Sequence, residues 1–531
     1  MNAELSARVA AWIADDVDPE AASELQALLD ADDETELADR FSGQLTFGTA
    51  GLRGPIRPGP NGMNRTVVRR AAAGLAAWLL EHGHSGQPVI VGFDGRHGSL
   101  DFARDSAAIF AAAGFEALLM PTTLPTPVLA FAVQHLRAAA GVMVTASHNP
   151  PADNGYKVYA SDGAQIVPPT DVEIEAAIQA VGPSRDIPLN PSAVPILGDE
   201  IVADYVSAVA ALIKPGPRDV TLVHTAMHGV GTVTLRRVFA AAGFAEPTSV
   251  GAQRDPDADF PTVSFPNPEE PGALDLAFAQ AAEVGADLII ANDPDADRCA
   301  VAAPGPDGWR MLRGDQVGVL LADALLRKGV RGTYATTIVS SSMLGALAAK
   351  HGMGYAETLT GFKWISRAAP DLVFGYEEAL GYAVAPELVR DKDGVSAALL
   401  VAELAADLKT SGSTVLDRLE ELYAEYGRYA TDQLSVRVDD LSLITAAMDR
   451  VRAAPPATLL GETATFTELL PDTDGVRLTF DGGRVVIRPS GTEPKLKAYL
   501  EVVLPGGTAR EASERLDRLR AEIATALGVS A

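Results

Sequence analysis

The sequence predicts an α/β protein of four domains, in which three related α/β domains precede a smaller C-terminal α+β domain. At 531 residues the chain is too long for one hydrophobic core, and a length of about 150 residues per domain gives three or four. The hexapeptide Phe-Ala-Ala-Ala-Gly-Phe occurs at 110–115 and again at 239–244, and a looser version lies at 347–353. After each copy comes a strand that runs into a polar loop. Recurrence over such long intervals indicates related α/β domains rather than a solenoid.

Composition and charge narrow the class of protein. Hydrophobic residues at 47% and charged residues at 21% are typical of a soluble globular protein. The formal charge of −27 argues against nucleic acid and anionic membrane as partners, because both are held by basic surfaces. If the substrate is an anion, basic residues must cluster at its binding site, because the negative net charge of the chain would otherwise repel it.

Cysteine usage and hydropathy favour a cytoplasmic enzyme. The single cysteine, Cys299, allows no intrachain disulfide and fits a reducing compartment. Residues 1–14 carry acids and have no apolar core, so we expect no signal peptide. No stretch reaches the ~18 to 20 apolar residues that a membrane span needs.

The N-terminal region predicts helices followed by a glycine-rich loop. Residues 4–40 predict two amphipathic helices, the second opened by Asp18-Pro19. The stretch 47–54 has three glycines spaced by threes, which allow close backbone approach, and Arg53 could fork onto a phosphate. The alternative is a glycine-rich connector with a solvated arginine. A helix at 63–82 and a strand at 88–93 are expected next.

The stretch 141–159 contains the candidate nucleophile. A short apolar run at 141–144 predicts a buried strand, and the polar residues and prolines after it prevent a helix. Ser147 would then lie at the carboxyl end of a strand, where α/β sheets place their chemistry, with His148 and Lys157 near it. We interpret Ser147 as a serine that is phosphorylated or acylated. A polar turn between strands is the alternative.

Three aspartates at alternate positions of one loop, Asp293, Asp295 and Asp297, indicate a Mg²⁺ site built from hard oxygen ligands. The glycine and glutamate that an EF-hand needs at its sixth and twelfth positions are absent. A similar string at 255–259 has no apolar strand before it, and we interpret it as a turn-rich linker. The alternative for the later string is a solvated acidic turn.

Two further loops carry polar groups of a third domain. Lys363 lies between glycine and aromatic residues, where partial desolvation would lower its pKa towards acid/base work. A surface lysine that extends past Trp364 is the alternative. Glu377 and Glu378 could accept hydrogen bonds from sugar hydroxyls, or could be solvated.

From about residue 430 the pattern changes to that of a compact α+β domain. Strands at 476–480 and 484–488 flank Asp-Gly-Gly, a hairpin signal, and a strand at 497–503 precedes a helix at 509–527. Between the second and third strands, the stretch 488–495 combines hydroxyls, a glycine and flanking cations, which suit an anion-binding loop. A hairpin turn with surface charges is the alternative.

Taken in order, the Ser-His loop, the tri-aspartate loop, the Glu-Glu loop and the Arg-Ser-Gly-Thr loop resemble the α-D-phosphohexomutase superfamily over nearly the whole chain. The strings at 47–54 and 152–157 are similar to the branch of bacterial phosphoglucomutases, phosphomannomutases and phosphopentomutases. The resemblance implies four domains around a central cleft, which we expect at 1–205, 206–312, 313–428 and 429–531.

The resemblance also implies roles for individual residues. Ser147 would carry the phosphoryl group and would hold one Mg²⁺ together with Asp293, Asp295 and Asp297. The other residues implied at the transfer site are Lys363 as general acid/base, Arg53, His148 and Lys157. The residues implied at the substrate are Glu377 on the sugar and Arg488, Ser490, Gly491 and Thr492 on the phosphate that is not transferred. Glu378 is a further candidate for the sugar. We also expect Arg298 and Lys495 at the substrate, in a basic cluster with Arg53, Lys157, Lys363, Arg488 and Lys497.

The implied activity interconverts hexose 1-phosphate and hexose 6-phosphate, for glucose or mannose, through a phosphoserine enzyme with a sugar 1,6-bisphosphate as activator. Many hexose enzymes of the superfamily read Glu-x-Ser in the sugar loop, whereas this chain has Ala379. A phosphopentomutase is therefore the first alternative, followed by a serine phosphatase and a non-catalytic phosphosugar-binding protein. The expected partner is a small phosphosugar, with no nucleic acid and no membrane, and the expected state is a monomer or homodimer.

Overall fold

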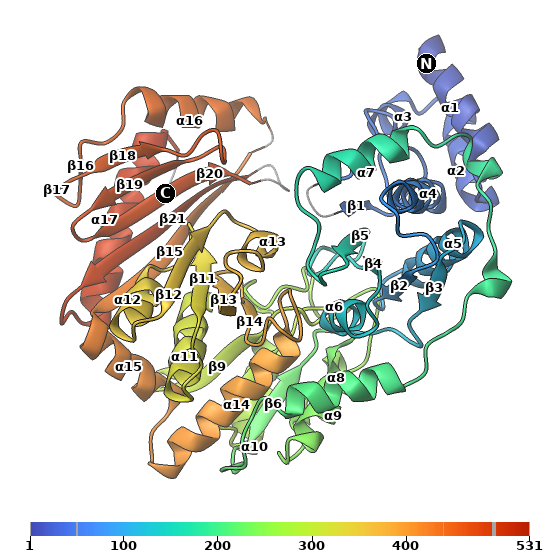
Figure 1. Ribbon diagram of the computed structural model, residues 1–531. Helices are drawn as coiled ribbons and strands as arrows, with labels where there is room; N and C mark the ends of the chain where they lie inside the picture. The colour runs from blue at the N-terminus through green and yellow to red at the C-terminus, as the bar shows by residue number, and fades with distance from the viewer. Residues whose placement is uncertain (1, 49–50, 439, 491–494, 530–531) are drawn as a thin grey trace. The chain divides into compact units, whose positions relative to one another are not determined.

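The computed structural model describes residues 2–48, 51–438, 440–490 and 495–529 (Figure 1). The chain forms two compact units, Met1–Leu312 with Gly381–Thr410, and Arg313–Leu380 with Ser411–Ala531. Among the described residues, every helix is too short or too polar to cross a membrane.

The N-terminal segment is helical and has a small core of its own. It contains α1 (Ala3–Asp15), α2 (Pro19–Asp30) and α3 (Glu34–Arg40). The Asp18 side chain caps α2 with proline in the first turn, as predicted. The prediction of only two helices is wrong, because Asp32 takes a left-handed φ of 56° and Asp33 caps a third helix. A break of this kind depends on two residues within an otherwise helical pattern.

The first sheet supports the serine loop. Its order is β1 (Gly51–Pro55), β5 (Asp153–Ala160), β4 (Ala140–Val144), β2 (Pro88–Phe93) and β3 (Glu116–Leu119). Strand β2 pairs in parallel with β3 and β4, while β5 pairs antiparallel with β4 and β1. The helices of this region are α4 (Arg65–Glu81), α5 (Ser99–Ala112), α6 (Thr126–His135) and α7 (Thr170–Gln179), with short 3₁₀ turns at Ser184–Asp186 and Pro191–Ala193. Strand β4 is buried throughout, as its unbroken apolar run predicts.

The second sheet repeats this plan and supports the tri-aspartate loop. Its order is β10 (Gly308–Met311), β9 (Ala300–Gly305), β8 (Leu288–Ala291), β6 (Leu222–Thr225) and β7 (Thr248–Ser249). The other elements of this region are α8 (Glu200–Ala210), α9 (Gly231–Ala241), a 3₁₀ turn at Gly251–Gln253, α10 (Asp275–Val284), β14 (Gly381–Ala383) and α14 (Gly394–Thr410). Helix α14 contacts α9 and β8 although it follows each of them by more than a hundred residues.

The second unit contains a parallel sheet and an antiparallel sheet. Strand β11 (Thr333–Thr337) pairs in parallel with β12 (Gly354–Thr358) and β13 (Leu372–Glu377). The helices are α11 (Gly314–Arg327), α12 (Met343–Lys350), α13 (Phe362–Ile365) and α15 (Val415–Tyr426). The antiparallel order is β15 (Arg428–Arg437), β21 (Lys495–Leu504), β20 (Gly483–Pro489), β19 (Val476–Phe480) and β18 (Thr465–Glu468). A small ladder joins β16 (Thr458–Leu459) to β17 (Glu462–Thr463).

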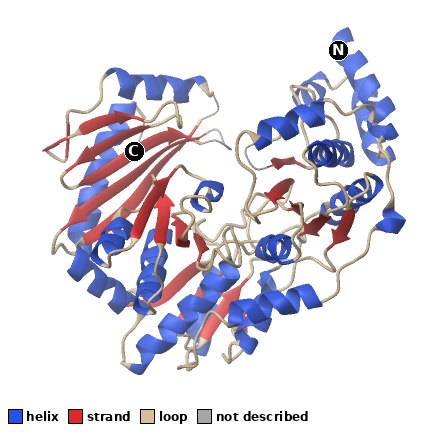
Figure 2. Ribbon diagram, in the orientation of Figure 1, coloured by secondary structure: helices blue, strands red, loops and turns tan. Residues whose placement is uncertain are grey.

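Helices α16 (Ser442–Ala453) and α17 (Ala509–Leu527) accompany the antiparallel sheet (Figure 2). Apolar residues of both helices, among them Met448 and Leu519, share one core with the strands. The hairpin predicted at Asp-Gly-Gly is confirmed, with Phe480 paired to Gly483. This domain has the α+β composition that the sequence predicts.

The internal repeat is a repeated helix ending. Helices α5, α9 and α12 each end just before a glycine with positive φ, Gly114, Gly243 and Gly352. In each case the next amide donates to a carbonyl five residues back, as from Phe115 to Phe110 at 3.0 Å. This bond is the signature of the Schellman motif, in which a glycine reverses the chain into the next strand. The repeat thus has a physical basis in all three α/β domains.

Candidate active site

Ser147 lies on a tight loop directly after β4. Its φ of 52° falls in the left-handed region, which is uncommon for a residue with a side chain. The Ser147 amide donates to Thr145 Oγ1 at 3.0 Å, and only 3% of the residue is exposed. The hydroxyl is therefore held in one place by a backbone conformation that the surrounding structure must enforce.

Arg96 supplies much of that enforcement. This buried guanidinium, two residues beyond Asp94 at the end of β2, donates to four backbone carbonyls of the serine loop. Nη2 donates to the carbonyls of Ser147 and Asn149 at 2.8 and 2.6 Å. Nη1 donates to two carbonyls further along, at 2.8 and 3.1 Å. Sequence reasoning gave no role to Arg96, because its partners lie some fifty residues away.

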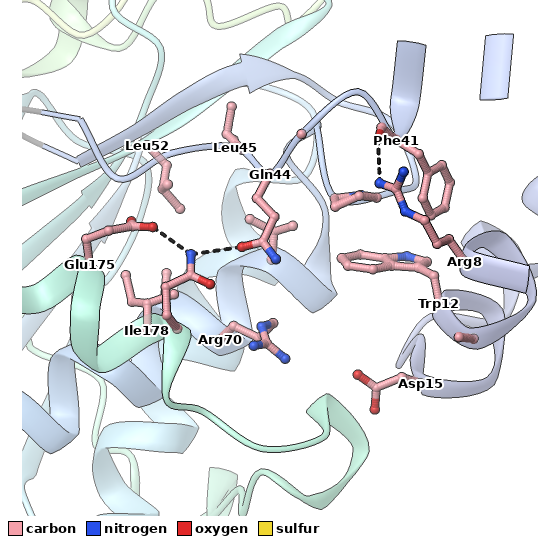
Figure 3. A pocket seen from close by; sticks show the side chains of 16 residues that line it. Arg8, Trp12, Asp15, Phe41, Gln44, Leu45, Leu52, Arg70, Glu175 and Ile178 are labelled. Atoms are coloured by element: carbon pink, nitrogen blue, oxygen red, sulfur yellow. Dashed lines mark hydrogen bonds between the residues drawn. The ribbon is translucent and has the colours of Figure 1, made fainter. Parts of the chain in front are cut away.

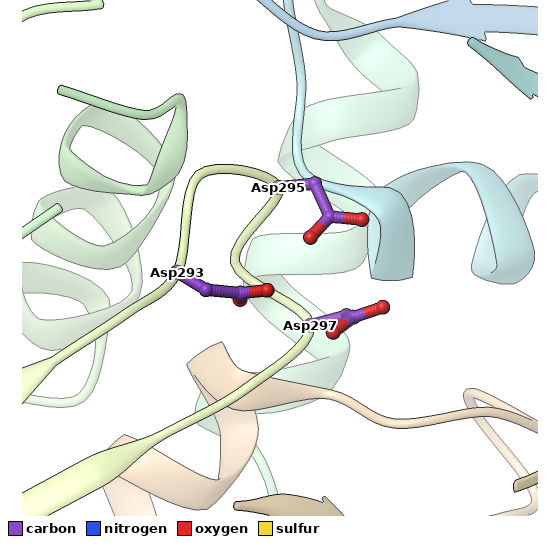
Figure 4. A group of neighbouring side chains, drawn as sticks. All are labelled: Asp293, Asp295 and Asp297. Atoms are coloured by element: carbon purple, nitrogen blue, oxygen red, sulfur yellow. The ribbon is translucent and has the colours of Figure 1, made fainter. Parts of the chain in front are cut away.

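The three aspartates form a compact cluster on the loop between β8 and β9 (Figure 4). Asp293, Asp295 and Asp297 are fully buried, and one ligand oxygen from each lies within 4.8 Å of the others. The Oδ1 atoms of Asp295 and Asp297 are buried without a hydrogen-bond partner. Buried carboxylate oxygens with no donor are costly unless a cation occupies the space between them.

The similar string at 255–259 behaves as the sequence predicts. All three of its aspartates are exposed, and no metal-sized group of carboxylates forms there among the described residues. Phe260 after it lies under the Arg96 guanidinium, 4.9 Å from the ring centroid to Cζ. The string is a turn-rich linker that packs against the first domain.

The fold brings Ser147 and the aspartate loop into direct contact. Ser147 Oγ donates to Asp293 Oδ2 at 2.9 Å although 146 residues separate them. On the other side of the cluster, Lys157 Nζ donates to Asp295 Oδ2 and Asp297 Oδ2 at 2.7 and 2.8 Å. A nucleophile, three carboxylates and an ammonium group thus share one buried locus.

His148 and Arg53 border the same locus. His148 Nδ1 lies 3.3 Å from Ser147 Oγ. Burial, with the nearby Arg298 and Arg53 charges, lowers the pKa of His148 well below its usual value, so the ring is neutral at pH 7. Arg53, exposed on β1, donates from Nη1 to Asn149 Oδ1 at 3.1 Å. The glycine-rich stretch therefore brings its arginine to the serine loop.

Sequence reasoning missed a second lysine. Lys392 Nζ lies 3.5 Å from Asp297 Oδ2, delivered by the stretch 390–394 before α14. This stretch is held by two tyrosine hydroxyls, from Tyr159 to Asp391 and from Tyr205 to Asp393, both at 2.8 Å. The alternation Arg-Asp-Lys-Asp-Gly before an apolar helix is the signal that could have indicated it.

Burial and charge set opposite protonation tendencies within the cluster. Burial and the Asp295 and Asp297 charges raise the pKa of Asp293 well above its usual range. Burial also opposes ionisation of Asp297, but Lys157 and Lys392 hold the pKa of that carboxyl below its usual value. Asp293 is therefore less well compensated than Asp297, with Arg298 Nε at 3.9 Å, and a divalent ion would supply further positive charge there.

The residues present fit a divalent cation. The cluster offers three hard oxygen ligands, two of them orphaned, and a serine oxygen beside the third. The nearby cations Lys157, Lys392 and Arg298 already offset three carboxylates; the Arg298 Nε lies 3.9 Å from both Asp293 and Asp297. A phosphoryl group on Ser147 would add a charge of roughly −2, which a divalent ion would balance.

The second unit holds the predicted lysine and glutamates. Lys363, on α13, is only 7% exposed, with Nζ 5.3 Å from the Trp364 ring centroid, so the expected partial desolvation is present. Glu377 ends β13 and is half-buried. Glu378 accepts from the hydroxyls of Ser340 and Thr337 at 2.9 and 3.2 Å. Burial and the neighbouring acids raise the pKa of Glu378 to about 7.

The same unit carries the predicted phosphate-loop residues on β20 and β21. Arg488 is half-buried, and Ser490 N donates to the Lys495 carbonyl at 2.8 Å. Gly491 and Thr492 lie outside the described residues. Burial and the Glu378 charge raise the pKa of Tyr499 while the Arg488 charge opposes them, so these charges face a common tyrosine.

Comparison with known proteins identifies the family. Four models match in order: phosphoglucomutase/phosphomannomutase α/β/α domain I at residues 44–184, domain II at 203–305, domain III at 313–426 and the C-terminal domain at 434–526. The chain belongs to the phosphoglucomutase/phosphomannomutase family. The resemblance to the α-D-phosphohexomutase superfamily is confirmed, and with it the class of isomerases that act by phosphoryl transfer.

Individual members of the family are similar over most of the chain. A probable phosphomannomutase of Haemophilus influenzae is 49% identical over 83% of this chain and 93% of its own length. A phosphopentomutase of Mus musculus is 34% identical over 96% of this chain and 92% of its own length. The crystal structure of a putative phosphomannomutase from Thermus thermophilus matches with a TM-score of 0.73 and 28% identity, covering 91% of this chain and 99% of that one.

Replacing Arg96 tests its hold on the serine loop. We expect Arg96→Gln to lower phosphomutase turnover by about 100-fold, because a nucleophile displaced by about 1 Å loses its alignment. Arg96→Lys should also be impaired, since one ammonium group cannot reach four carbonyls. Turnover and the phosphorylation of Ser147, followed by intact mass, measure the effect. The exposed Arg104→Gln on α5 is the matched control, and equal turnover in Arg96→Gln and this control would contradict the assignment.

The raised pKa of Glu378 predicts a pH-dependent stability. A carboxyl with its pKa raised from 4.5 to about 7 binds more protons in the folded state between these values. The folded protein should therefore lose stability relative to Glu378→Gln as the pH rises through this window. Urea unfolding of both proteins at pH 5 and pH 8 gives the difference in unfolding free energy. A difference that is the same at both pH values would show that Glu378 titrates normally.

Proposed function

We propose that this chain is a phosphosugar mutase that interconverts hexose 1-phosphate and hexose 6-phosphate, mannose and glucose, through phosphorylated Ser147. The observation that carries the proposal is the 2.9 Å contact between Ser147 Oγ and Asp293 within a buried carboxylate cluster. A turn between strands needs no such contact, so the contact favours a phosphorylated serine over a plain turn. The phosphomannomutase relative at 49% identity supports a hexose as the first choice.

The proposed reaction consists of two transfers in opposite directions. In the first, the bond between phosphorus and Ser147 Oγ breaks and a bond to a free sugar hydroxyl forms, giving a sugar bisphosphate. The hydroxyl loses its proton to a base, which we assign to Lys363, and the departing seryl oxygen is left among the cations of its site. In the second, the bisphosphate turns over and the Ser147 oxygen bonds to the other phosphorus. The bond from that phosphorus to its sugar oxygen breaks, and the sugar oxygen takes back the proton held by Lys363. Catalysis is then mainly positioning and charge stabilisation.

The residues of the first unit provide that stabilisation. Lys157, Arg53 and Arg298 would offset charge on the transferring group, and neutral His148 would hydrogen-bond beside the seryl oxygen. When bound to Asp293, Asp295, Asp297 and a phosphoserine oxygen, Mg²⁺ would neutralise phosphoryl charge and polarise the oxygen atoms.

The residues of the second unit complete the proposal. Glu377 and Glu378 would accept hydrogen bonds from the sugar, and Arg488, Ser490, Gly491, Thr492 and Lys495 would bind the phosphate that is not transferred. We keep the domain boundaries 1–205, 206–312, 313–428 and 429–531 and the bisphosphate activator as parts of this proposal. The single cysteine supports a cytoplasmic location.

A phosphopentomutase is the second candidate, because Ala379 provides no hydroxyl at the position where many hexose enzymes have serine. Ser340 offers a substitute, since its Oγ lies 2.9 Å from Glu378 Oε2 and 2.8 Å from Thr337 Oγ1. We propose that these hydroxyls orient Glu378 for a hexose hydroxyl. The phosphopentomutase relative at 34% identity supports a pentose phosphate as the second candidate substrate.

A substrate panel tests the choice of sugar. We expect kcat/KM to be highest for mannose 1-phosphate or glucose 1-phosphate, and at least about tenfold lower for ribose 1-phosphate. Ser147→Ala should abolish turnover of all three while leaving binding intact. A dominant rate with ribose 1-phosphate would establish the pentomutase. Release of inorganic phosphate as fast as substrate disappears would establish a phosphatase, and binding without turnover in the unmodified chain a mere binding protein.

Charge balance predicts that phosphorylation and metal binding reinforce each other. Chelation should stop turnover and added Mg²⁺ should restore it. Titration calorimetry should show Mg²⁺ binding at least about tenfold more tightly to the phosphoserine form than to Ser147→Ala, because the phosphoryl group adds a ligand and negative charge. Asp295→Asn should weaken binding in both forms. Equal Mg²⁺ affinities of the phosphoserine form and Ser147→Ala would contradict the proposed coupling between phosphorylation and metal binding.

A further inference from the structure

A cavity of about 480 Å³ lies where the N-terminal helices meet the first α/β domain (Figure 3). Its lining comes from three helices and from the stretch that leads into β1: Arg8, Trp12 and Asp15 of α1, Val67 and Arg70 of α4, Glu175, Ile178 and Gln179 of α7, and Phe41, Gln44, Leu45 and Leu52. The family match begins only at residue 44, so α1 contributes from outside the matched domain. None of the roles proposed above uses this cavity.

The cavity exists because two hydrophobic cores face each other without merging. Leu5, Val9, Leu25 and Phe41 form one core, with Trp12 packed against it, while Leu52 belongs to the core of the first domain. Hydrogen bonds fasten the two parts around the gap. Thr66 Oγ1 donates to Asp16 at 2.7 Å, Ser184 N donates to Asp15 at 2.9 Å, and Asn61 N donates to the Arg40 carbonyl at 3.1 Å. The cavity is therefore held open rather than free to collapse.

The lining has a flat aromatic surface whose orientation is fixed. The Trp12 indole N–H donates to Asp16 Oδ2 at 3.0 Å, and the Trp12 ring meets Phe41 edge to face at 6.3 Å. Aliphatic side chains, including Leu45 and Ile178, line the opposite side. A cavity lined by an indole on one side and aliphatic groups on the other favours a flat apolar body.

The polar groups of the lining favour a negative charge on the occupant. Both carboxylates already accept two hydrogen bonds, Asp15 from the backbone at 184 and 185, and Glu175 from Phe47 N and Gln179. The two guanidinium groups donate only to neutral carbonyls, Arg8 to Phe41 and Arg70 to residues 181 and 182. Within the described part of the chain, neither arginine has a carboxylate within 4.0 Å. Guanidinium groups of this kind bind carboxylate, sulfonate or phosphate.

We propose that this cavity is a binding site for a small organic anion with a flat aromatic or heteroaromatic ring. The ring lies against Trp12, and the anionic group pairs with Arg8 and Arg70. Leu52 lines the cavity, and neighbouring side chains of a strand point to opposite faces, so the occupant lies behind the strand that presents Arg53. A bound molecule would therefore contact β1, the strand that carries Arg53 to the serine loop.

Two fluorescent probes that differ only in their charge test the proposal, anilinonaphthalene sulfonate and the neutral N-phenylnaphthylamine. We expect the wild-type chain to bind the sulfonate at least about tenfold more tightly than the neutral probe, from one or two charge-assisted hydrogen bonds. The double variant Arg8→Gln, Arg70→Gln should lose this preference and keep the affinity for the neutral probe. Trp12→Leu should weaken both probes.

Arg104→Gln is the matched control, an exposed arginine of α5 that does not line the cavity, and should bind both probes as the wild type does. The single variant Arg8→Gln, whose exposed side chain donates to one carbonyl and lies over the Phe41 ring, covers the case in which the double variant does not fold. Equal affinity for the two probes in the wild type, or unchanged sulfonate affinity in the arginine variants, would overturn the site. The titration uses no sugar phosphate, so its result is independent of the proposed mutase activity.

Discussion

Burial of three carboxylates on one loop is the constraint on which the first unit depends. A buried carboxylate costs several kcal/mol unless cations and hydrogen bonds compensate it, and Asp293, Asp295 and Asp297 are fully buried together. Lys157 comes from the first sheet and Lys392 from a stretch that follows the loop by about ninety residues. Burial of the aspartate loop requires both Lys157 and Lys392 in place. Completing the fold therefore also assembles the site.

The same constraint explains details of the packing around the loop. Residues 381–410 join the first unit, although the family's third domain spans 313–426. A Cβ on Gly394 would lie 2.2 Å from the Arg298 carbonyl oxygen, so only glycine lets this stretch come close enough to present Lys392. The hydroxyls of Tyr159 and Tyr205, both fully buried, fix the aspartates on either side of that lysine. The stretch 381–410 therefore belongs to the first unit because Lys392 offsets the charge of the aspartate loop, although its place in the chain is within the third domain.

Local chemistry could be predicted from the sequence where spacing alone decides it. The strand before Ser147, the alternate aspartates and the Asp-Gly-Gly hairpin each depend on a few adjacent residues. Arg96 and Ser340 could not be found in this way, because their partners are backbone carbonyls or a carboxylate far along the chain. For Lys392, the Arg-Asp-Lys-Asp-Gly alternation is a local signal, but its partner Asp297 is also distant in the sequence. The third N-terminal helix was missed because the sequence pattern is helical on both sides of Asp32, and the left-handed backbone of this one residue leaves no clear mark in the pattern.

Positive charges that are not paired with carboxylates explain how an acidic chain can bind an anionic substrate. Lys157 and Lys392 are committed to aspartates, so they offset charge that the fold itself creates. Arg53 and Arg488 differ, because among the described residues neither has a carboxylate within 4.0 Å. One belongs to each unit, and each stands beside a loop that the family resemblance assigns to a phosphate. A phosphatase requires one position for phosphate, whereas a bisphosphorylated intermediate requires two. Arg53 and Arg488 therefore give this chain of net charge −27 two separate cationic positions for phosphate, as a mutase needs.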